Sequence, residues 1–79
     1  MDLQKFIGKF AEQFDETDAS EFKADTEFRT FADWGSMVGL SVIAMVDEEY
    51  GFTLNVEDFK KSKTIEELFN VVKENKTKG

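Results

Sequence analysis

Apolar residues at the start of the chain recur with the period of an α-helix, and this pattern limits the fold more than any other feature. They fall at i, i+3, i+4, i+7 and i+11, with charged and amide side chains between them. Asp2 can cap the helix, and the polar cluster at residues 15–18 can end it. An amphipathic helix of this kind must bury one side against other elements; the residues of that side are Leu3, Phe6, Ile7, Phe10 and Phe14.

Residues 15–35 follow neither a helical period nor a strand period. Aromatic residues lie at irregular intervals among acids, Ser, Thr and Ala. A loop of about 20 residues is unusual inside a compact domain, and it usually has a function or contains a hidden short helix. We expect a long loop that is held in place by Phe22, Phe28, Phe31 and Trp34.

Residues 36–50 contain the unbroken apolar run of residues 42–46, followed by three acids. A buried strand would also fit the run, but its length and its Met and Ala content favour a largely buried helix. Gly39 would cost this helix about 1 kcal/mol relative to alanine. Gly51 provides the stop signal.

Two capping patterns predict the remaining helices. Asn55 followed by Asp58 indicates a short helix that carries Val56 and Phe59, and Thr64 with Glu67 matches a capping box. The apolar stripe of the last helix is Ile65, Leu68, Phe69 and Val72, and the polar residues 73–79 should fray. We therefore predict a single domain over residues 1–79, an all-α bundle of three main helices plus one short helix with a long first loop.

Composition excludes several classes of function. The chain has neither cysteine nor histidine, so disulfides, the usual zinc sites and Ser-His-Asp or Cys-His catalysis cannot form within it. No stretch has the length of a membrane span, and residues 1–11 lack the pattern of a secretory signal, so we expect a cytoplasmic protein. The net charge of -7 argues against a nucleic-acid partner.

The acidic charge is concentrated in the middle of the chain. Residues 12–58 hold 13 acids against Lys23 and Arg29 (net -11), whereas residues 59–79 have a net charge of +3. A fold that gathers the middle segment on one side would present a negative face to basic partners.

Ser36 is the best-placed polar residue for chemistry. It lies between the long loop and the most apolar helix, where free N–H groups and the helix dipole favour a bound or attached phosphate. Position alone, however, favours an ordinary N-cap.

The surroundings of Ser36 resemble the acyl carrier protein family over nearly the whole chain. The similarity rests on Trp34-Gly35-Ser36-Met37, on the stretch Ile43-Ala44-Met45-Val46-Asp47-Glu48-Glu49-Tyr50-Gly51, and on Thr64 to Phe69. It implies an acyl-carrier-protein-like bundle and no enzymatic activity. It also implies that Ser36 receives 4′-phosphopantetheine from coenzyme A through a phosphodiester, and that the thiol of this group carries an acyl or aminoacyl thioester.

The resemblance also implies partners. These are a phosphopantetheinyl transferase and acyl-loading or acyl-transferring enzymes, whose basic patches dock against the helix that begins at Ser36. We expect a monomer, because such a carrier visits many enzymes. Met37 and Leu40 could instead belong to the core, and Asp47-Glu48 could be a solvated turn. The expected interface consists of Asp33, Gly35, Met37, Val38, Leu40, Ser41, Ala44, Asp47 and Glu48.

The chain departs from the family pattern at several positions. Gly35 replaces the family's Asp before the modified serine, and Asp33 is a candidate substitute. Val38 and Ser41 stand where many carriers of fatty acid biosynthesis have acids, which favours a dedicated partner set in a specialised pathway. Bulky residues at positions 59, 68 and 69 favour a short cargo.

Other classes of function fit less well. The best calcium-loop window begins at Asp15 but has Ser20 in place of the required Gly and Thr26 in place of the required Glu. An enzyme with paired carboxylates would have little concave volume for a substrate. A carrier-like helical interaction module that is not modified remains the main alternative, and Gly35 is its best support.

Overall fold

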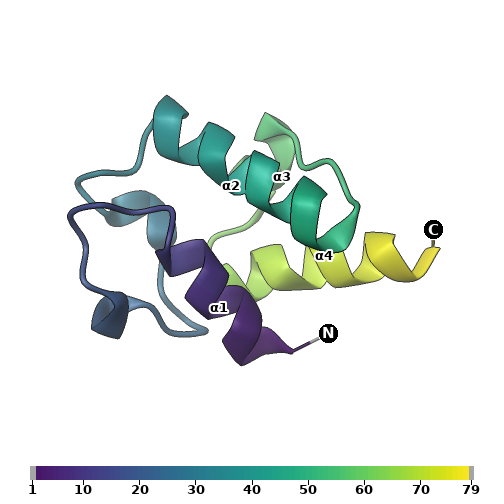
Figure 1. The fold of residues 1–79 in the computed structure, drawn as a ribbon, viewed down its shortest axis with the longest axis horizontal. Coiled ribbons are helices and arrows are strands. Elements are labelled where there is room, and N and C mark those ends of the chain that lie inside the picture. The colour runs from purple at the N-terminus through teal and green to yellow at the C-terminus, as the bar shows by residue number, and fades with distance from the viewer. Residues whose placement is uncertain (1, 79) are drawn as a thin grey trace.

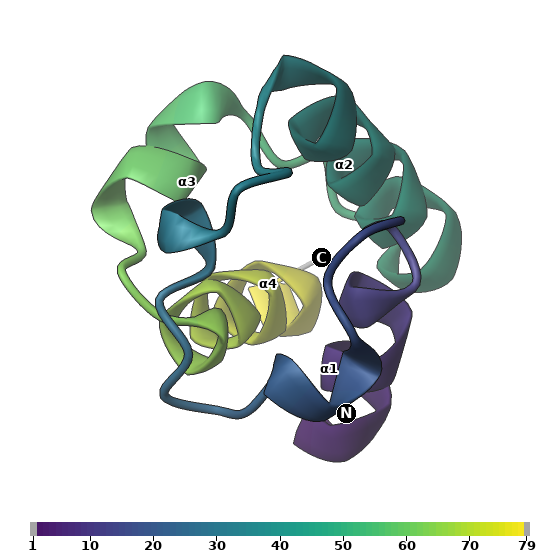
Figure 2. The ribbon, with the colours of Figure 1, turned by 90° about the vertical axis from the view of Figure 1, so that its left-hand side faces the viewer.

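A computed structural model describes residues 2–78, with side chains up to Asn75, and every regular element in this range is helical (Figure 1). The four α-helices are α1 (Leu3–Ala11), α2 (Ser36–Tyr50), α3 (Val56–Lys61) and α4 (Ile65–Lys78). Helices α1, α2 and α4 pack against one another, and α3 packs on the other side of α4 (Figure 2). The predicted all-α class, with three main helices, one short helix and a long first loop, is confirmed.

Helix α1 begins as predicted but ends earlier than its apolar pattern. The Gln4 N–H donates to Asp2 Oδ1 at 3.0 Å, so Asp2 is the cap. The helix ends at Ala11, and the Phe14 N–H then bonds the Ala11 carbonyl at 3.1 Å in a tighter turn. Phe14 remains buried because this turn keeps it on the apolar side. The expectation that the helix itself continues to Phe14 was therefore wrong.

The aromatic rings of the long connection between α1 and α2 pack into the core. It contains two short 3₁₀ turns, at Ala19–Glu21 and Phe28–Thr30, which confirms a hidden helical element. Phe22 and Phe28 are buried, and the Phe28 ring lies 5.3 Å from that of Phe10 and 5.0 Å from that of Trp34 between ring centroids. Aromatic packing therefore fixes a loop that has little regular structure.

Backbone carbonyls of the same loop also cap the start of α4. The Ile65 N–H donates to the Thr26 carbonyl at 3.1 Å, and the Glu66 N–H donates to the Ala24 carbonyl at 2.9 Å. Thr64 Oγ1 accepts from the Glu67 N–H at 3.2 Å, as a capping residue does. The opening N–H groups of α4, which a helix cannot satisfy internally, thus bind loop carbonyls and the Thr64 hydroxyl.

The remaining helix ends follow their sequence signals. Asn55 and Asp58 form the predicted capping box, and Gly51 ends α2 in the left-handed conformation at φ 69°. Helix α4 includes residues 73–78; their fraying stays a prediction, and Gly79 lies outside the described residues. Within residues 2–78, no helix is both long and apolar enough to cross a bilayer.

Replacing Phe28 tests whether the loop depends on its rings. Phe28→Ala should lower the free energy of unfolding by about 3–5 kcal/mol, because it leaves a cavity between α1 and α3. Phe28→Leu should cost less and keep the protein folded for a second measurement. Urea unfolding followed by circular dichroism gives both values. Val56→Ala, at a side chain that is 61% exposed, should change stability by no more than about 0.5 kcal/mol. Equal effects of the Phe28→Ala and Val56→Ala changes would contradict the packing described.

Candidate functional site

Ser36 is the first residue inside α2 and not its cap. Gly35 occupies the N-cap position with an extended backbone, and no side chain caps the helix. The Ser36 side chain is exposed, and its hydroxyl has no hydrogen-bond partner within the described residues. The interpretation of Ser36 as an ordinary N-cap is therefore wrong. One residue into the helix, its hydroxyl is free to react.

The amino end of α2 lacks the negative groups that the other helices have. Asp2 caps α1, α3 has Glu57 and Asp58 in its first turn, and α4 has two glutamates there. In α2 the first turn has no acid, and the first internal bond runs from the Gly39 N–H to the Gly35 carbonyl at 2.8 Å. The N–H groups of residues 36–38 precede that bond. Such an end favours an anion because of its free donors and the helix dipole.

Gly35 leaves open space before Ser36. No atom lies within 4 Å of the position that a Cβ at residue 35 would take, and its φ of -177° is extended backbone open to any residue. The structure therefore does not require glycine here. A side chain here would meet no neighbour at its Cβ.

Asp33 has a structural task in the loop. Its Oδ1 accepts from the Thr17 hydroxyl at 2.7 Å, and its Oδ2 accepts from the Glu16 N–H at 3.2 Å. The Thr17 hydrogen bond is the main reason why the pKa of Asp33 lies below its ordinary value. Asp33 thus joins the two ends of the long loop, and its role in place of a carboxylate at position 35 stays a prediction.

An apolar groove of about 440 Å³ runs beside Ser36. Its walls come from the loop, α2 and α3, and Trp34 packs against Phe59 with ring centroids 5.1 Å apart. Gly39 deepens the groove, since a Cβ there would lie 3.8 Å from the Phe59 ring. We call this the attachment groove; it is lined by Arg29, Trp34, Gly35, Ser36, Gly39, Leu40, Ile43, Val56, Phe59 and Lys60.

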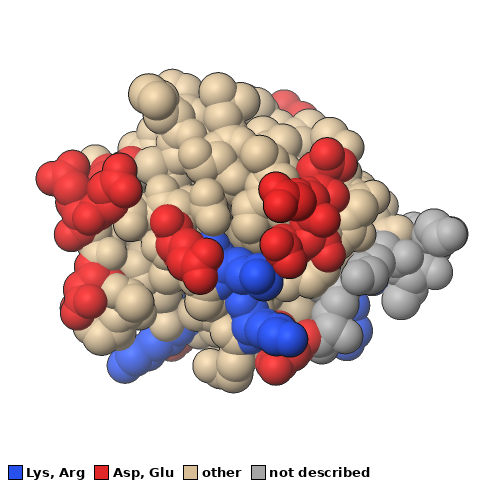
Figure 3. Space-filling model, viewed as in Figure 1, with Lys and Arg blue, Asp and Glu red and all other residues tan. Residues whose placement is uncertain are grey.

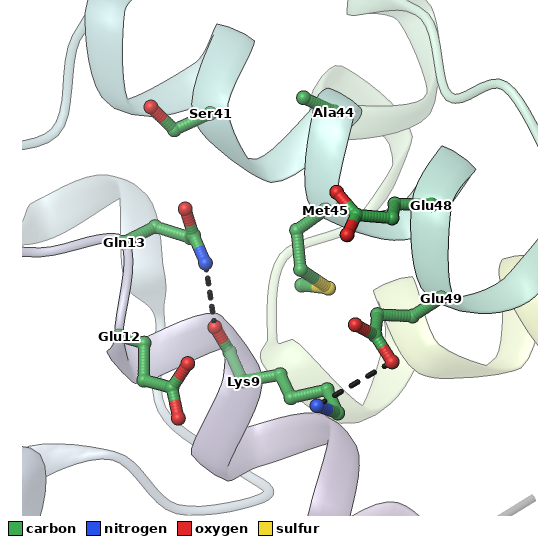
Figure 4. A pocket seen from close by; sticks show the side chains of 8 residues that line it. All are labelled: Lys9, Glu12, Gln13, Ser41, Ala44, Met45, Glu48 and Glu49. Atoms are coloured by element: carbon green, nitrogen blue, oxygen red, sulfur yellow. Dashed lines mark hydrogen bonds and ion pairs between the residues drawn. The ribbon is translucent and has the colours of Figure 1, made fainter.

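A second hollow, of about 290 Å³, lies between α1 and α2 (Figure 4). Small side chains at Ser41 and Ala44 leave room on α2, and Glu48 lies further along the same helix. Lys9 Nζ forms an ion pair with Glu49 Oε1 at 3.4 Å, and the Gln13 amide donates to the Lys9 carbonyl at 3.0 Å. Residues 41, 44 and 48, which the sequence analysis expected at a partner interface, therefore share a hollow with residues of α1 and of the turn after it.

The residues expected at a partner interface are all exposed or half-buried. Met37 is 82% exposed and Leu40 is 65% exposed, so the interpretation of these two as core residues is wrong. Val38 is half-buried, and Asp47 is exposed. On the face shown in Figure 3, acidic groups gather over the carboxyl end of α2, whereas the amino half of α2 is covered by uncharged atoms.

Sequence reasoning missed the contributions from other elements. Lys9, Glu12 and Gln13 of the hollow and Val56 of the groove were assigned only to helices, and Arg29 was assigned no role. Trp34 was expected to hold the loop and to belong to the motif around Ser36, but not to line a groove with residues of α3. The one sequence feature that could have drawn attention to Arg29 is that it is the sole arginine of the chain. Within the described residues, no group of three or more acids converges to hold a metal ion.

Comparison with known proteins gives one match. Residues 4–72, which include α2, α3 and most of α1 and α4, match the family described as phosphopantetheine attachment site. No curated protein matches the chain, and neither does any solved structure.

Removal of the Ser36 hydroxyl should leave stability almost unchanged. Because the hydroxyl has no partner in the described protein, Ser36→Ala should alter the free energy of unfolding by no more than about 0.5 kcal/mol. Asn55→Ala removes a true cap and should cost about 1 kcal/mol. Urea unfolding of the two variants side by side checks this. A loss at position 36 as large as that at position 55 would restore the N-cap interpretation.

The Asp33 contact should make stability depend on pH in the acid range. The folded-state pKa of Asp33 lies below the unfolded one, so its contribution is present above the unfolded pKa and is lost as pH falls through the folded pKa. The stability difference between the parent and Asp33→Asn should therefore shrink on acidification. Thr17→Val removes the main cause and should move the pKa of Asp33 back towards its ordinary value. A carboxyl titration by NMR that shows no such movement would contradict the assignment.

Proposed function

The chain belongs to the phosphopantetheine attachment-site family, and on that premise we propose that Ser36 is the residue that bears the group. Members of this family are carrier proteins without catalytic activity of their own, and 4′-phosphopantetheine is attached to them covalently. The observation that carries the proposal is the exposed, unbonded hydroxyl of Ser36 at the start of α2.

The chemistry of attachment suits this position. The Ser36 oxygen forms a bond to the phosphorus that bears the pantetheine in coenzyme A, the pyrophosphate bond breaks, and 3′,5′-ADP leaves. The hydroxyl proton passes to the transferase. Within the described part of the chain, the Ser36 hydroxyl has no protein hydrogen bond to give up in this reaction, and the open space at Gly35 leaves it accessible.

The residues around Ser36 also fit the group once it is attached. The first turn of α2 has no acid that would repel a phosphodiester, and its free N–H groups and dipole favour the negative charge. When bound, the group supplies a terminal thiol that carries the acyl chain as a thioester. The attachment groove offers an apolar surface next to the point of attachment.

The exposed side of α2 is the proposed docking surface for partner enzymes. Met37 and Leu40 provide apolar contact near Ser36, and Asp47 and Glu48 provide negative charge further along. Basic patches on the transferase and on acyl-handling enzymes would meet these acids. Exposed charges act mainly on association rate and partner choice. Val38 and Ser41 are uncharged where many carriers of fatty acid biosynthesis have acids, and this difference supports a dedicated partner set in a specialised pathway.

The cargo proposed is short. Phe59, Leu68 and Phe69 are all buried, and Phe69 packs on Phe6 with ring centroids 5.4 Å apart. Side chains therefore occupy the space between these helices, and the packed rings of Phe59 and Trp34 form part of the wall of the attachment groove. We also propose that the protein works as a cytoplasmic monomer, which can present the same side of α2 to each enzyme in turn.

Intact mass measures the modification directly. After incubation with coenzyme A, Mg²⁺ and a broad-specificity phosphopantetheinyl transferase, the parent should gain the mass of one phosphopantetheine. Ser36→Ala should gain none. Ser20→Ala is the matched control, because it removes an exposed serine hydroxyl of the long loop, outside α2, and should be modified like the parent.

The Gly35→Asp variant separates the two candidate functions. The structure accepts an aspartate there, so this variant should fold. If the host's own transferase and the broad-specificity enzyme both fail on the parent but modify Gly35→Asp, the chain is a carrier fold that is no longer loaded, and the unmodified interaction module is the better interpretation. Equal modification of parent and variant would show that Gly35 does not impair loading.

A further inference from the structure

Arg29 is one of two cations in residues 12–58, a segment that also contains 13 acids. Its side chain is exposed on the 3₁₀ turn Phe28–Thr30 and makes no ion pair within the described residues. A guanidinium remains charged and offers several donors in one plane, a shape that matches a carboxylate. The sole arginine of this acidic chain is therefore available to an anion from outside the protein.

The fold brings Arg29 next to three lysines from the basic end of the sequence. The 3₁₀ turn lies beside α3 (Figure 2), and a hollow of about 250 Å³ between them is lined by both elements and the residues that follow α3. All four cations are exposed. We call them the basic corner; they are Arg29, Lys60, Lys61 and Lys63.

Buried neighbours in the chain fix the basic corner. Phe28 precedes Arg29 and Phe59 precedes Lys60; both rings are buried, and their centroids lie 6.3 Å apart. Ser62, which stands between the other two lysines in the sequence, is only 1% exposed. The cations thus extend from backbone that the core holds in place, so little backbone ordering is needed when an anion binds.

Few acids of the chain compete for the basic corner. Glu27 is the single acid that lines the hollow, against four cations, so the hollow has a net charge of +3 on a protein whose net charge is -7. Lys60 Nζ lies 3.8 Å from Glu57 Oε1, but both side chains are largely exposed, and such pairs are weak. The corner is therefore a local positive surface without strong partners in the described residues.

We propose that the basic corner is a docking surface for a carboxylate-rich segment of a partner protein. Clustered cations also attract nucleic acids and anionic membranes, but these carry negative charge over their whole extent and would also be repelled by the 17 acids of the chain. A protein can present a few carboxylates beside neutral or basic surface, so it reaches the corner without that repulsion. Charge complementarity therefore favours a protein with a local acidic patch.

The position of the corner relates this contact to Ser36. Arg29 and Lys60 also line the attachment groove, which contains the serine. A partner seated on the corner would therefore border that groove. If the same partner also met Asp47 and Glu48 through basic groups, it would be recognised by charges of both signs and could dock in one orientation only.

Titration with a defined acidic peptide tests the surface. The probe is hexaglutamate with both ends capped, and NMR follows the backbone amides of the isotope-labelled protein. Amide shifts should be largest at residues 27–30 and 60–64. Because exposed ion pairs are individually weak, we expect a Kd of about 1 mM at low salt. About 0.5 M salt should weaken the binding at least about fivefold, since exposed charges are screened.

Paired variants separate the basic corner from net charge. Arg29→Gln combined with Lys60→Gln should raise the Kd about five- to tenfold. The matched control combines Lys5→Gln with Lys23→Gln, which removes the same charge from exposed lysines that do not line the hollow. It should change the Kd by less than about twofold. Equal losses in the two double variants, or shifts spread evenly over the protein, would overturn the inference.

Two further probes distinguish the possible occupants. Inorganic phosphate should bind more weakly than hexaglutamate, and vesicles of phosphatidylglycerol and phosphatidylcholine should not bind through the corner. If phosphate moved the same amides with a Kd as low as that of the peptide, the corner would be a site for small anions. If the vesicles bound the parent but not the Arg29→Gln, Lys60→Gln variant, it would be a membrane contact. Either result would overturn the inference.

A photo-cross-linker at Thr30, an exposed residue that lines the hollow, tests the partner itself. Thr30→p-benzoylphenylalanine in the native cell should give a cross-link to a protein peptide with clustered acids. That protein, once purified, should bind the Arg29→Gln, Lys60→Gln variant at least about fivefold more weakly than the parent, and the lysine control like the parent. A cross-linked peptide without clustered acids, or no protein cross-link, would overturn the inference.

The inference does not depend on modification of Ser36. Ser36→Ala should bind hexaglutamate like the parent, because the serine is not among the residues that line the hollow. Failure of loading, which is visible by mass, would refute the proposed function and leave the basic corner in place. Failure of the peptide and cross-linking tests would refute the basic corner and leave the loading result unchanged.

Discussion

The ring of Phe28 is the contact on which the position of Ser36 depends. It is fully buried and packs on Phe10 of α1, on Trp34 and, at 6.3 Å between centroids, on Phe59 of α3. The connection has only two short 3₁₀ turns, so ordering its backbone carries a large entropic cost. The packing of this ring offsets that cost. Because Trp34 packs on the same ring two residues before Ser36, the start of α2 is placed by core packing and not by a cap.

Elements with a local signal could be predicted from the sequence. The bounds of α2, its stop at Gly51 and the caps Asp2 and Asn55 follow from period and capping chemistry. The end of α1 could not be predicted, because a tight turn keeps Phe14 in phase with the helix. The cap of α2 was missed because Ser36 has the residue type of a cap but lies one position inside the helix. The attachment groove depends on side chains that are distant in sequence, such as Arg29 and Val56, and no local pattern reports such contacts.

The two ends of α2 differ in their charged surroundings. Asp47 and Glu48 are exposed near its carboxyl end, where Figure 3 shows acidic groups, whereas Arg29 and Lys60 line the groove beside its amino end. The amino end of α2 thus combines a first turn without acids with the exposed apolar side chains Met37 and Leu40. If Ser36 is modified as proposed, the attached group and the acids lie at opposite ends of one helix.

The hydrogen bonds from the start of α4 to the Ala24 and Thr26 carbonyls have a dynamic consequence. They join segments that are distant in sequence, so the first turn of α4 is complete only when the loop is in place. Loop and helix must then open together, as one cooperative unit, and the amides of Ile65 and Glu66 exchange with solvent only when the loop also leaves the core. The segment that leads to Ser36 is thereby coupled to the start of α4, and we expect it to act as a rigid support and not as a hinge.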